Sequence, residues 1–139
     1  PPPPPGTVTV GAVSAIVGFP DLDIGTFIDR TFNQNFRRDY RLAISRSAGV
    51  GYEDVIITNI ISGSVLVETM ILFPTDWGSD SFASAFANRL RTNTLAVFNS
   101  MPASYGPIVA NFIETTTAIN VYSPPPSPMV PPSPPPQPP

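Results

Sequence analysis

Two segments of the chain carry hydrophobic residues at the spacing of an amphipathic helix. The first covers residues 24–40, where large apolar side chains recur at helical intervals and share one face. Its apolar positions are Ile24, Phe27, Ile28, Phe32, Phe36 and Tyr40. Asp21 or Asp23 is the expected N-cap, and Gly49 and Gly51 are expected to end the helix.

The second amphipathic segment begins near residue 79. Its apolar positions are Phe82, Ala83, Phe86, Ala87 and Leu90, continued over residues 94–101 by Leu95 and Phe98. The expected N-cap is Asp76, Ser79 or Asp80, since each can accept a hydrogen bond from the first turn. The sequence therefore predicts a second helix.

Four further segments are rich in β-branched and aromatic residues and are predicted to be strands. They are residues 7–19, 54–61, 64–73 and 108–122. Only Ser62 and Gly63 separate the second segment from the third, which is typical of a β-hairpin. In the first segment the alternation changes phase beside Gly11, which predicts a β-bulge, and Pro20 is expected to end the strand.

The predicted elements follow one another in the order β-α-β-β-α-β. This order predicts an α+β domain of the ferredoxin-like, split βαβ type, with both helices on one face of a four-stranded sheet. The domain is expected to cover residues 7–122. Residues 1–6 and 123–139 are expected to form an N-terminal and a C-terminal tail outside it.

Proline changes the interpretation of these two tails. The chain has 139 residues, of which 20 are proline; five of these form residues 1–5 and eleven lie within residues 124–139. Consecutive prolines favour the polyproline II helix, in which the C-terminal run would reach about 50 Å. The tails are therefore either stiff spacers or ligands for another subunit, and the sequence leaves both alternatives open.

Charge and missing residue types narrow the classes of function. The chain has no cysteine and no histidine, and its seven basic residues, all arginine, are outnumbered by ten acids. Disulfides, thiolate or imidazole metal sites and a histidine-dependent catalytic triad are excluded. The composition argues against nucleic-acid binding, and no apolar run is long enough to span a membrane. We expect a structural or binding role, with no enzyme activity, metal or cofactor.

The tails resemble the hydroxyproline-rich, extensin-like glycoproteins of green algal and plant extracellular matrices. The resemblance rests on the pattern SPPPSP and PPSPPPQPP in residues 123–139. It implies an extracellular protein whose prolines are hydroxylated and carry O-linked glycans, with Ser123 as a further candidate; no N-glycosylation sequon is present. The modification candidates are Pro1, Pro2, Pro3, Pro4, Pro5, Pro124, Pro125, Pro126, Ser127, Pro128, Pro131, Pro132, Ser133, Pro134, Pro135, Pro136, Pro138 and Pro139.

The predicted hairpin carries a second resemblance. The segment GSVLV, which begins at Gly63 and Ser64, is similar to the cleavage motif of SEA domains. Together with FASAFANRL, its extension GSVLVETMILFP also resembles small domains of volvocine algal wall proteins. The SEA resemblance implies self-cleavage, in which the Ser64 hydroxyl attacks the Gly63 carbonyl in an N→O acyl shift and water then hydrolyses the ester. The alternative is an ordinary turn in which Gly63 supplies conformational freedom.

Three other groups of residues are candidates for binding. Acid pairs at 21 and 23, 53 and 54, and 76 and 80 could hold Ca²⁺, although helix capping explains them better. Arg30, Arg37 and Arg41 share a helical face that could meet acids of a neighbouring subunit or simply face solvent. Phe73 and Trp77, beside Pro74, could stack on a sugar or proline, although such aromatics more often belong to a core edge.

Taken together, these patterns predict a structural subunit of an extracellular fibril, wall or matrix. Its partners would be copies of itself in a head-to-tail polymer, or neighbouring matrix proteins. The alternatives are a glycan- or protein-binding module on a proline stalk, and a self-cleaving SEA domain cut between Gly63 and Ser64.

Overall fold

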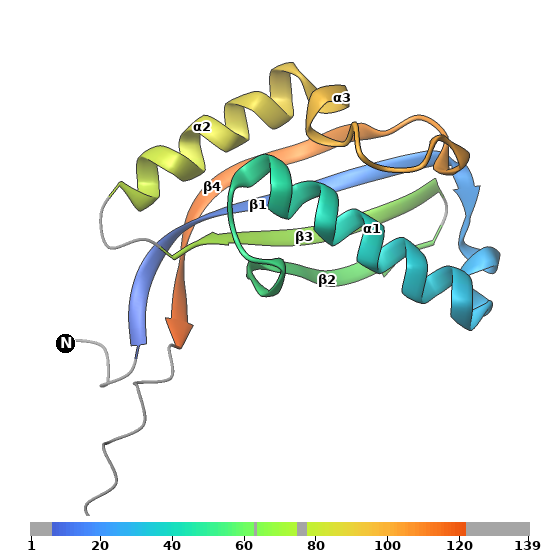
Figure 1. Ribbon diagram of the computed structural model, residues 1–139, viewed down its shortest axis with the longest axis horizontal. Coiled ribbons are helices and arrows are strands. Elements are labelled where there is room, and N and C mark those ends of the chain that lie inside the picture. The colour runs from blue at the N-terminus through green and yellow to red at the C-terminus, as the bar shows by residue number, and fades with distance from the viewer. Residues whose placement is uncertain (1–6, 63, 75–77, 122–139) are drawn as a thin grey trace, which may run out of the picture.

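The fold is built on one four-stranded antiparallel sheet, as seen in a computed structural model that describes residues 7–62, 64–74 and 78–121 (Figure 1). Its strands are β1 (Thr7–Asp23), β2 (Val55–Ile61), β3 (Ser64–Phe73) and β4 (Val109–Val121). They lie in the order β2-β3-β1-β4, with the two long strands β1 and β4 side by side. The predicted α+β domain with a four-stranded sheet is therefore confirmed.

The two main helices cover the same side of this sheet (Figure 1). They are α1 (Arg30–Ala48) and α2 (Ser79–Thr92), followed by the single turn α3 (Thr94–Val97). Short 3-10 helices lie at Ile24–Ile28, Tyr52–Asp54 and Ala103–Tyr105. The opposite side of the sheet carries no helix of the described residues, so the described part of the domain has two layers.

The start of α1 differs from the prediction. Asp23 does act as a cap, but of the 3-10 helix, where its carboxylate accepts a hydrogen bond from the Gly25 amide at 2.9 Å. Asp29 caps α1 itself, since its side chain accepts from the amide of Phe32 at 3.0 Å. The predicted end is confirmed, because Gly49 adopts the left-handed conformation with φ of 74°.

The phase change beside Gly11 is not a β-bulge. The pairing of β1 with β3 is continuous from Gly11 to Phe19, so successive side chains alternate between the two faces. Val10 and Ala12 therefore point to the helix-free side of the sheet, where they form a small separate buried cluster with Leu72. Because both faces of β1 are apolar here, hydrophobic and polar residues do not alternate cleanly in the sequence.

Pro20 does not end β1, which continues to Asp23. The register with β3 shifts between Phe19 and Asp23, so Pro20 lies where the regular pairing is interrupted. A residue without an amide hydrogen is tolerated at such a position because no ladder hydrogen bond is lost.

The N-terminus of α2 is anchored by Ser79 without a side-chain cap. Gly78 occupies the N-cap position and makes no side-chain hydrogen bond, so the predicted capping role of Ser79 or Asp80 is wrong; Asp76 lies outside the described residues. The Ser79 hydroxyl instead accepts from the Gly11 amide and donates to the Phe73 carbonyl, both at 2.6 Å. This pair of hydrogen bonds ties the helix to β1 and β3.

An aromatic cluster forms the centre of the core between α1 and the sheet. Phe36 is fully buried, and its ring lies 5.0 Å from that of Phe19, 4.9 Å from Phe27 and 5.2 Å from Tyr105 in edge-to-face geometry. Tyr40 stacks against Phe36 at 6.0 Å. The periodic positions Phe36 and Tyr40 are thus correctly predicted as core residues.

Three predicted core residues are exposed instead. Ile28 is 88% exposed, Leu95 is 73% exposed and Phe82 is 48% exposed. Ile28 belongs to the 3-10 helix before α1, and Leu95 to the short turn α3. The 3.6-residue period of the main helices therefore does not extend to Ile28 or Leu95, whereas Phe82 lies within α2 on a side that no described residue fully covers.

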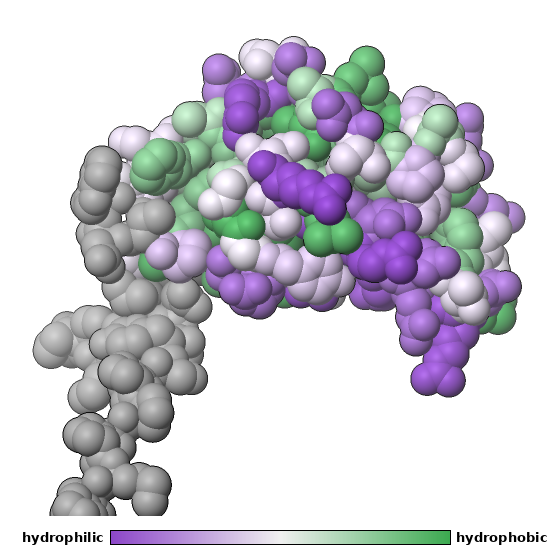
Figure 2. All heavy atoms as spheres, in the orientation of Figure 1, coloured by the Kyte–Doolittle hydropathy of each residue, from purple (hydrophilic) through white to green (hydrophobic). Residues whose placement is uncertain are grey.

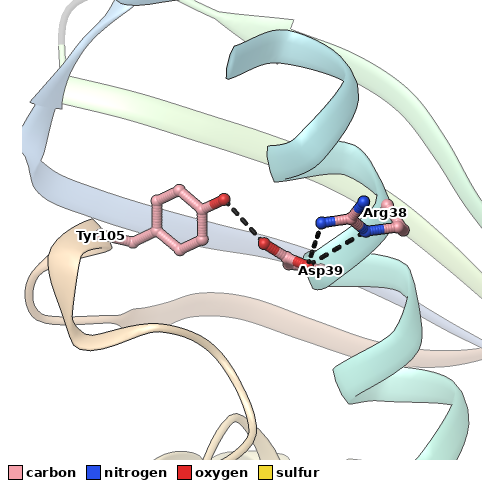
Figure 3. Close-up of polar contacts among 3 residues, drawn as sticks. All are labelled: Arg38, Asp39 and Tyr105. Carbon is pink, nitrogen blue, oxygen red and sulfur yellow. Dashed lines mark hydrogen bonds and ion pairs between the residues drawn. The ribbon is translucent and has the colours of Figure 1, made fainter. Parts of the chain in front are cut away.

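One polar network ties the loop before β4 to α1. The Tyr105 hydroxyl donates to Asp39 at 2.8 Å, and Asp39 also pairs with Arg38 at 3.2 Å (Figure 3). Burial, together with the hydrogen bond to Asp39 and its negative charge, raises the pKa of Tyr105 to about 12. The network keeps the loop on the aromatic cluster as long as this phenol stays neutral.

A second buried phenol makes the fold sensitive to alkaline pH. Tyr40 is fully buried and shares a 2.6 Å hydrogen bond with Thr69. Burial raises the pKa of Tyr40 well above its ordinary value of 10.0, and the bond to Thr69 only partly opposes this.

We expect the free energy of unfolding to fall above about pH 10. Since the folded-state pKa of Tyr40 exceeds the unfolded-state value, the stability due to its neutral form is complete below that pH and is lost as pH rises towards the folded pKa. The free energy of unfolding should fall with pH by up to about 1.4 kcal/mol per pH unit for each tyrosine whose pKa is raised by folding. Urea unfolding followed by circular dichroism should show a shallower loss for Tyr40→Phe, with Tyr105 still contributing. An equally steep loss in Tyr40→Phe would contradict this assignment.

Candidate interaction surface

The helix-free side of the sheet exposes large apolar side chains, and we call it the open face. Its apolar residues that are at least partly exposed include Ile16, Ile56, Leu66, Met70, Val109 and Phe112, whereas Val10, Ala12 and Leu72 on the same side are buried. Phe112 is 49% exposed, Val109 47% and Ile56 40%. Neighbouring strands place these side chains on one surface, because residues that pair in an antiparallel sheet point to the same face.

The charges of the open face are few and of one sign. Glu68 on β3 and Glu114 on β4 point to this side, and none of the four strands contains arginine or lysine. The charged side chains of α1 gather on the opposite layer, where Figure 2 shows hydrophilic residues over this helix. The open face is therefore apolar, with two carboxylates and no cation from its own strands.

A groove lies at the hairpin end of the open face. It has a volume of about 330 Å³ and is lined by Gly18, Pro20, Ser62, Ser64, Leu66, Val109 and Asn111. All seven lining residues are uncharged. The groove thus combines apolar walls with hydroxyl and amide groups.

Gly18 lines this groove at a position where any larger residue would place a side chain. A Cβ atom at this position would lie 2.9 Å from the Asn111 amide nitrogen and 3.3 Å from a Leu66 methyl group. Within the described residues the side chains of Ser62, Ser64 and Asn111 make no hydrogen bond. Their donors are therefore available to a ligand that enters the groove.

Ser64 and Leu66 of the proposed cleavage motif line the same groove. Ser64 is exposed, begins β3 and pairs with Asp23, whereas Gly63 lies outside the described residues. Val65 and Val67 are fully buried core residues, as the turn interpretation expects. Cleavage between Gly63 and Ser64 stays a prediction.

A second groove lies between α2 and β4. It has a volume of about 400 Å³ and is lined by Asp80, Ala83, Ser84, Thr115, Thr116 and Thr117. Hydroxyl groups and one carboxylate dominate this lining, which is a chemistry suited to sugar hydroxyls. Glycan binding itself stays a prediction.

Two of the other predicted binding residues, Asp54 and Arg41, have structural roles. The Asp54 carboxylate accepts from the Gly51 amide at 3.1 Å, while burial raises its pKa. Arg41 donates to the carbonyls of Val55 and Tyr52 and lies 3.9 Å from the Tyr52 ring centre, so it serves its own chain. Among the described residues no three potential metal-binding side chains gather at one place.

Two further predictions concern aromatic residues. Phe73 is 2% exposed and belongs to the core, so it cannot stack on a ligand; Trp77 lies outside the described residues. On the open face, an exposed aromatic of the described residues is Phe112, which the sequence did not single out. Strict alternation from Ile113, which is partly buried and packs against the core, would have placed Phe112 on the open face.

The proposed modification sites lie outside the described residues, in 1–6 and 122–139. The structure does describe where the chain enters and leaves the domain, because Thr7 pairs with Val121 at one end of the sheet. None of the helices in the described part of the chain combines the length and apolar content needed to cross a bilayer.

Comparison with known proteins adds no relative. No protein-family model matches the chain, and no curated protein or solved structure shows a significant match.

Proposed function

We propose that the chain is a structural subunit of an extracellular glycoprotein fibril or wall, with copies of itself as partners. The observation that carries the proposal is the open face, with Ile56, Val109 and Phe112 exposed on one sheet surface. Monomeric domains rarely expose a contiguous apolar surface of this kind, which is typical of contacts with another chain. The uncharged proline-rich tails supply reach and stiffness between domains.

We further assign the domain to the ferredoxin-like, SEA-like class. The assignment is supported by the element order β1-α1-β2-β3-α2-β4 and the strand order β2-β3-β1-β4. Two helices on one side of an antiparallel sheet belong to the same arrangement. SEA-like domains accompany heavily glycosylated proteins, and this association agrees with O-linked glycans on the tail prolines.

Deletion of residues 123–139 is expected to abolish filament formation, because heterologous contacts between domain and tail cannot form without the tail. Negative-stain electron microscopy of the native protein and of the deletion variant measures this directly. As a control, a variant that lacks only residues 138–139 should still assemble. Filaments that persist after deletion of the whole tail would contradict assembly through it.

The glycoprotein part of the proposal has its own measurement. Mass spectra of tail peptides from native material should show hydroxyproline and attached sugars at several prolines of residues 124–139. Unmodified prolines throughout would remove the algal-matrix interpretation and leave a plain proline linker.

A further inference from the structure

The groove at the hairpin end of the open face has the chemistry of a polyproline-binding site. Polyproline offers backbone carbonyls as acceptors but no amide donors, so a complementary site must supply donors and apolar surface without charge. Ser62, Ser64 and Asn111 provide donors, and Pro20, Leu66 and Val109 provide apolar walls, as the groove lining shows. An uncharged, proline-rich ligand matches this lining.

The half-exposed ring of Phe112 adds the aromatic element that such sites use. Phe112 follows Asn111 in β4 and pairs with Ile16, so it lies on the same face as the groove. Proline-rich peptides in polyproline II geometry dock against aromatic side chains in this way.

The chain itself contains a segment with matching chemistry. Residues 122–139 carry no charged side chain. Within residues 123–139, Met129 and Val130 are the only apolar residues other than proline, and they interrupt the Ser-Pro pattern. A plain spacer gains nothing from exposing these two side chains, whereas an apolar groove would bury them. Because neither residue is a proline, neither can be hydroxylated and then glycosylated as the resemblance implies for the tail prolines.

Geometry decides which copy of the tail reaches the groove. The tail leaves the domain after Val121, ten residues along β4 from Asn111, a path of about 33 Å. Met129 lies eight residues beyond Val121, which spans about 25 Å in polyproline II geometry. A tail that retraced β4 would end before Asn111, which favours the tail of another copy as the occupant of the groove.

The two carboxylates of the open face favour a tail over a second sheet. Pairing the open faces of two copies would bring Glu68 and Glu114 of each together in an apolar contact without a cation from any strand. Burying unpaired carboxylates is costly. An uncharged tail in the groove avoids this cost.

We propose that the groove formed by Gly18, Ser64, Leu66, Val109 and Asn111 binds the Met129–Val130 region of the C-terminal tail of a second copy. The inference rests on the proposed assembly and names its contact. Since the tail leaves one end of the sheet and the groove lies at the other, each contact leaves a free groove and a free tail. Repetition of the contact then produces an open head-to-tail filament.

Titration of the ¹⁵N-labelled full chain with a synthetic peptide of residues 122–139 tests the proposal. Saturable shifts are expected at the amides of Gly18, Ser64, Leu66 and Asn111. A peptide with Met129→Ser and Val130→Ser should bind at least about fivefold more weakly, and a peptide with Gln137→Ser should bind normally. No saturable shift, or shifts centred on another surface, would overturn the proposal.

Substitutions in the domain give a matched pair. Phe112→Ser is expected to weaken peptide binding at least about fivefold, whereas Phe82→Ser should leave it unchanged. The two rings are 49% and 48% exposed, so the loss of exposed apolar area is the same. Equal binding by both variants would contradict a role for the open face.

Dilution of the full chain separates a neighbour's tail from the chain's own. Groove amide shifts that change with protein concentration support binding between copies, and shifts independent of concentration would overturn it. Peptide binding without filaments in native material would count against the proposed function alone. Filaments without peptide binding would count against this groove alone.

Discussion

Phe36→Ala is expected to lower the free energy of unfolding by about 3–5 kcal/mol, the largest effect of any single core truncation in this domain. Phe36 is fully buried and sits among Phe19, Phe27, Tyr40 and Tyr105, four rings from different segments of the fold. Truncation leaves a cavity that rigid rings cannot fill by small movements. It also removes the edge-to-face contacts that join α1 to β1.

Urea unfolding followed by circular dichroism measures this loss. Phe36→Leu retains most of the buried volume and should lose about half as much or less. Phe112→Ala is the matched control, because it removes the same atoms from a half-exposed ring, and its loss should stay near about 1 kcal/mol or below. Similar midpoints for Phe36→Ala and Phe112→Ala would contradict the central place of this cluster.

Gly11→Ala is expected to cost about 2–4 kcal/mol, although alanine is normally preferred to glycine in a strand. A Cβ atom at Gly11 would lie 2.7 Å from the carbonyl oxygen of Ser79 and 3.0 Å from the amide of Asp80. These are backbone atoms at the start of α2, so the helix itself must move. The movement would also disturb the hydrogen bond from the Gly11 amide to the Ser79 hydroxyl.

Two variants separate the steric effect from the hydrogen bonds. Ser79→Ala removes the hydroxyl alone and should cost about 1–2 kcal/mol, whereas Gly11→Ala should remain harmful in the Ser79→Ala background because the clash is with the backbone. Gly25→Ala is the matched control: its Cβ would meet nothing closer than 3.5 Å. Equal midpoint temperatures of thermal unfolding for Gly11→Ala and Gly25→Ala would contradict close packing of α2 against Gly11.

The strands were predictable because their signal is local. The segment 64–73 is bounded by a turn and a proline, and β3 has these bounds in the structure. The start of α1 was missed because Asp21, Asp23 and Asp29 are all acceptable caps, and the chain between them forms a 3-10 turn. Choosing among such caps depends on where the helix packs, which local propensity does not encode.

The open face and its groove were beyond prediction for a related reason. Phe82 and Phe112 are both large and apolar, and the sequence assigned the first to the core and left the second unremarked. In the structure both are about half exposed, since α2 turns Phe86 and Leu90 inward and only one sheet face is covered. Sequence periodicity reports that an element has an apolar side, but not whether another element covers it.

The sequence alone therefore determined the elements that follow from local periodicity and from proline. These are the strands and the approximate helices, because alternation and helical spacing act over a few residues; the proline-rich tails stay a prediction. Only the tertiary structure decided that the first residues of α2 pack against Gly11 and that Gly18 lines a groove. Both roles depend on atoms more than forty residues away, Ser79 in one case and Leu66 and Asn111 in the other.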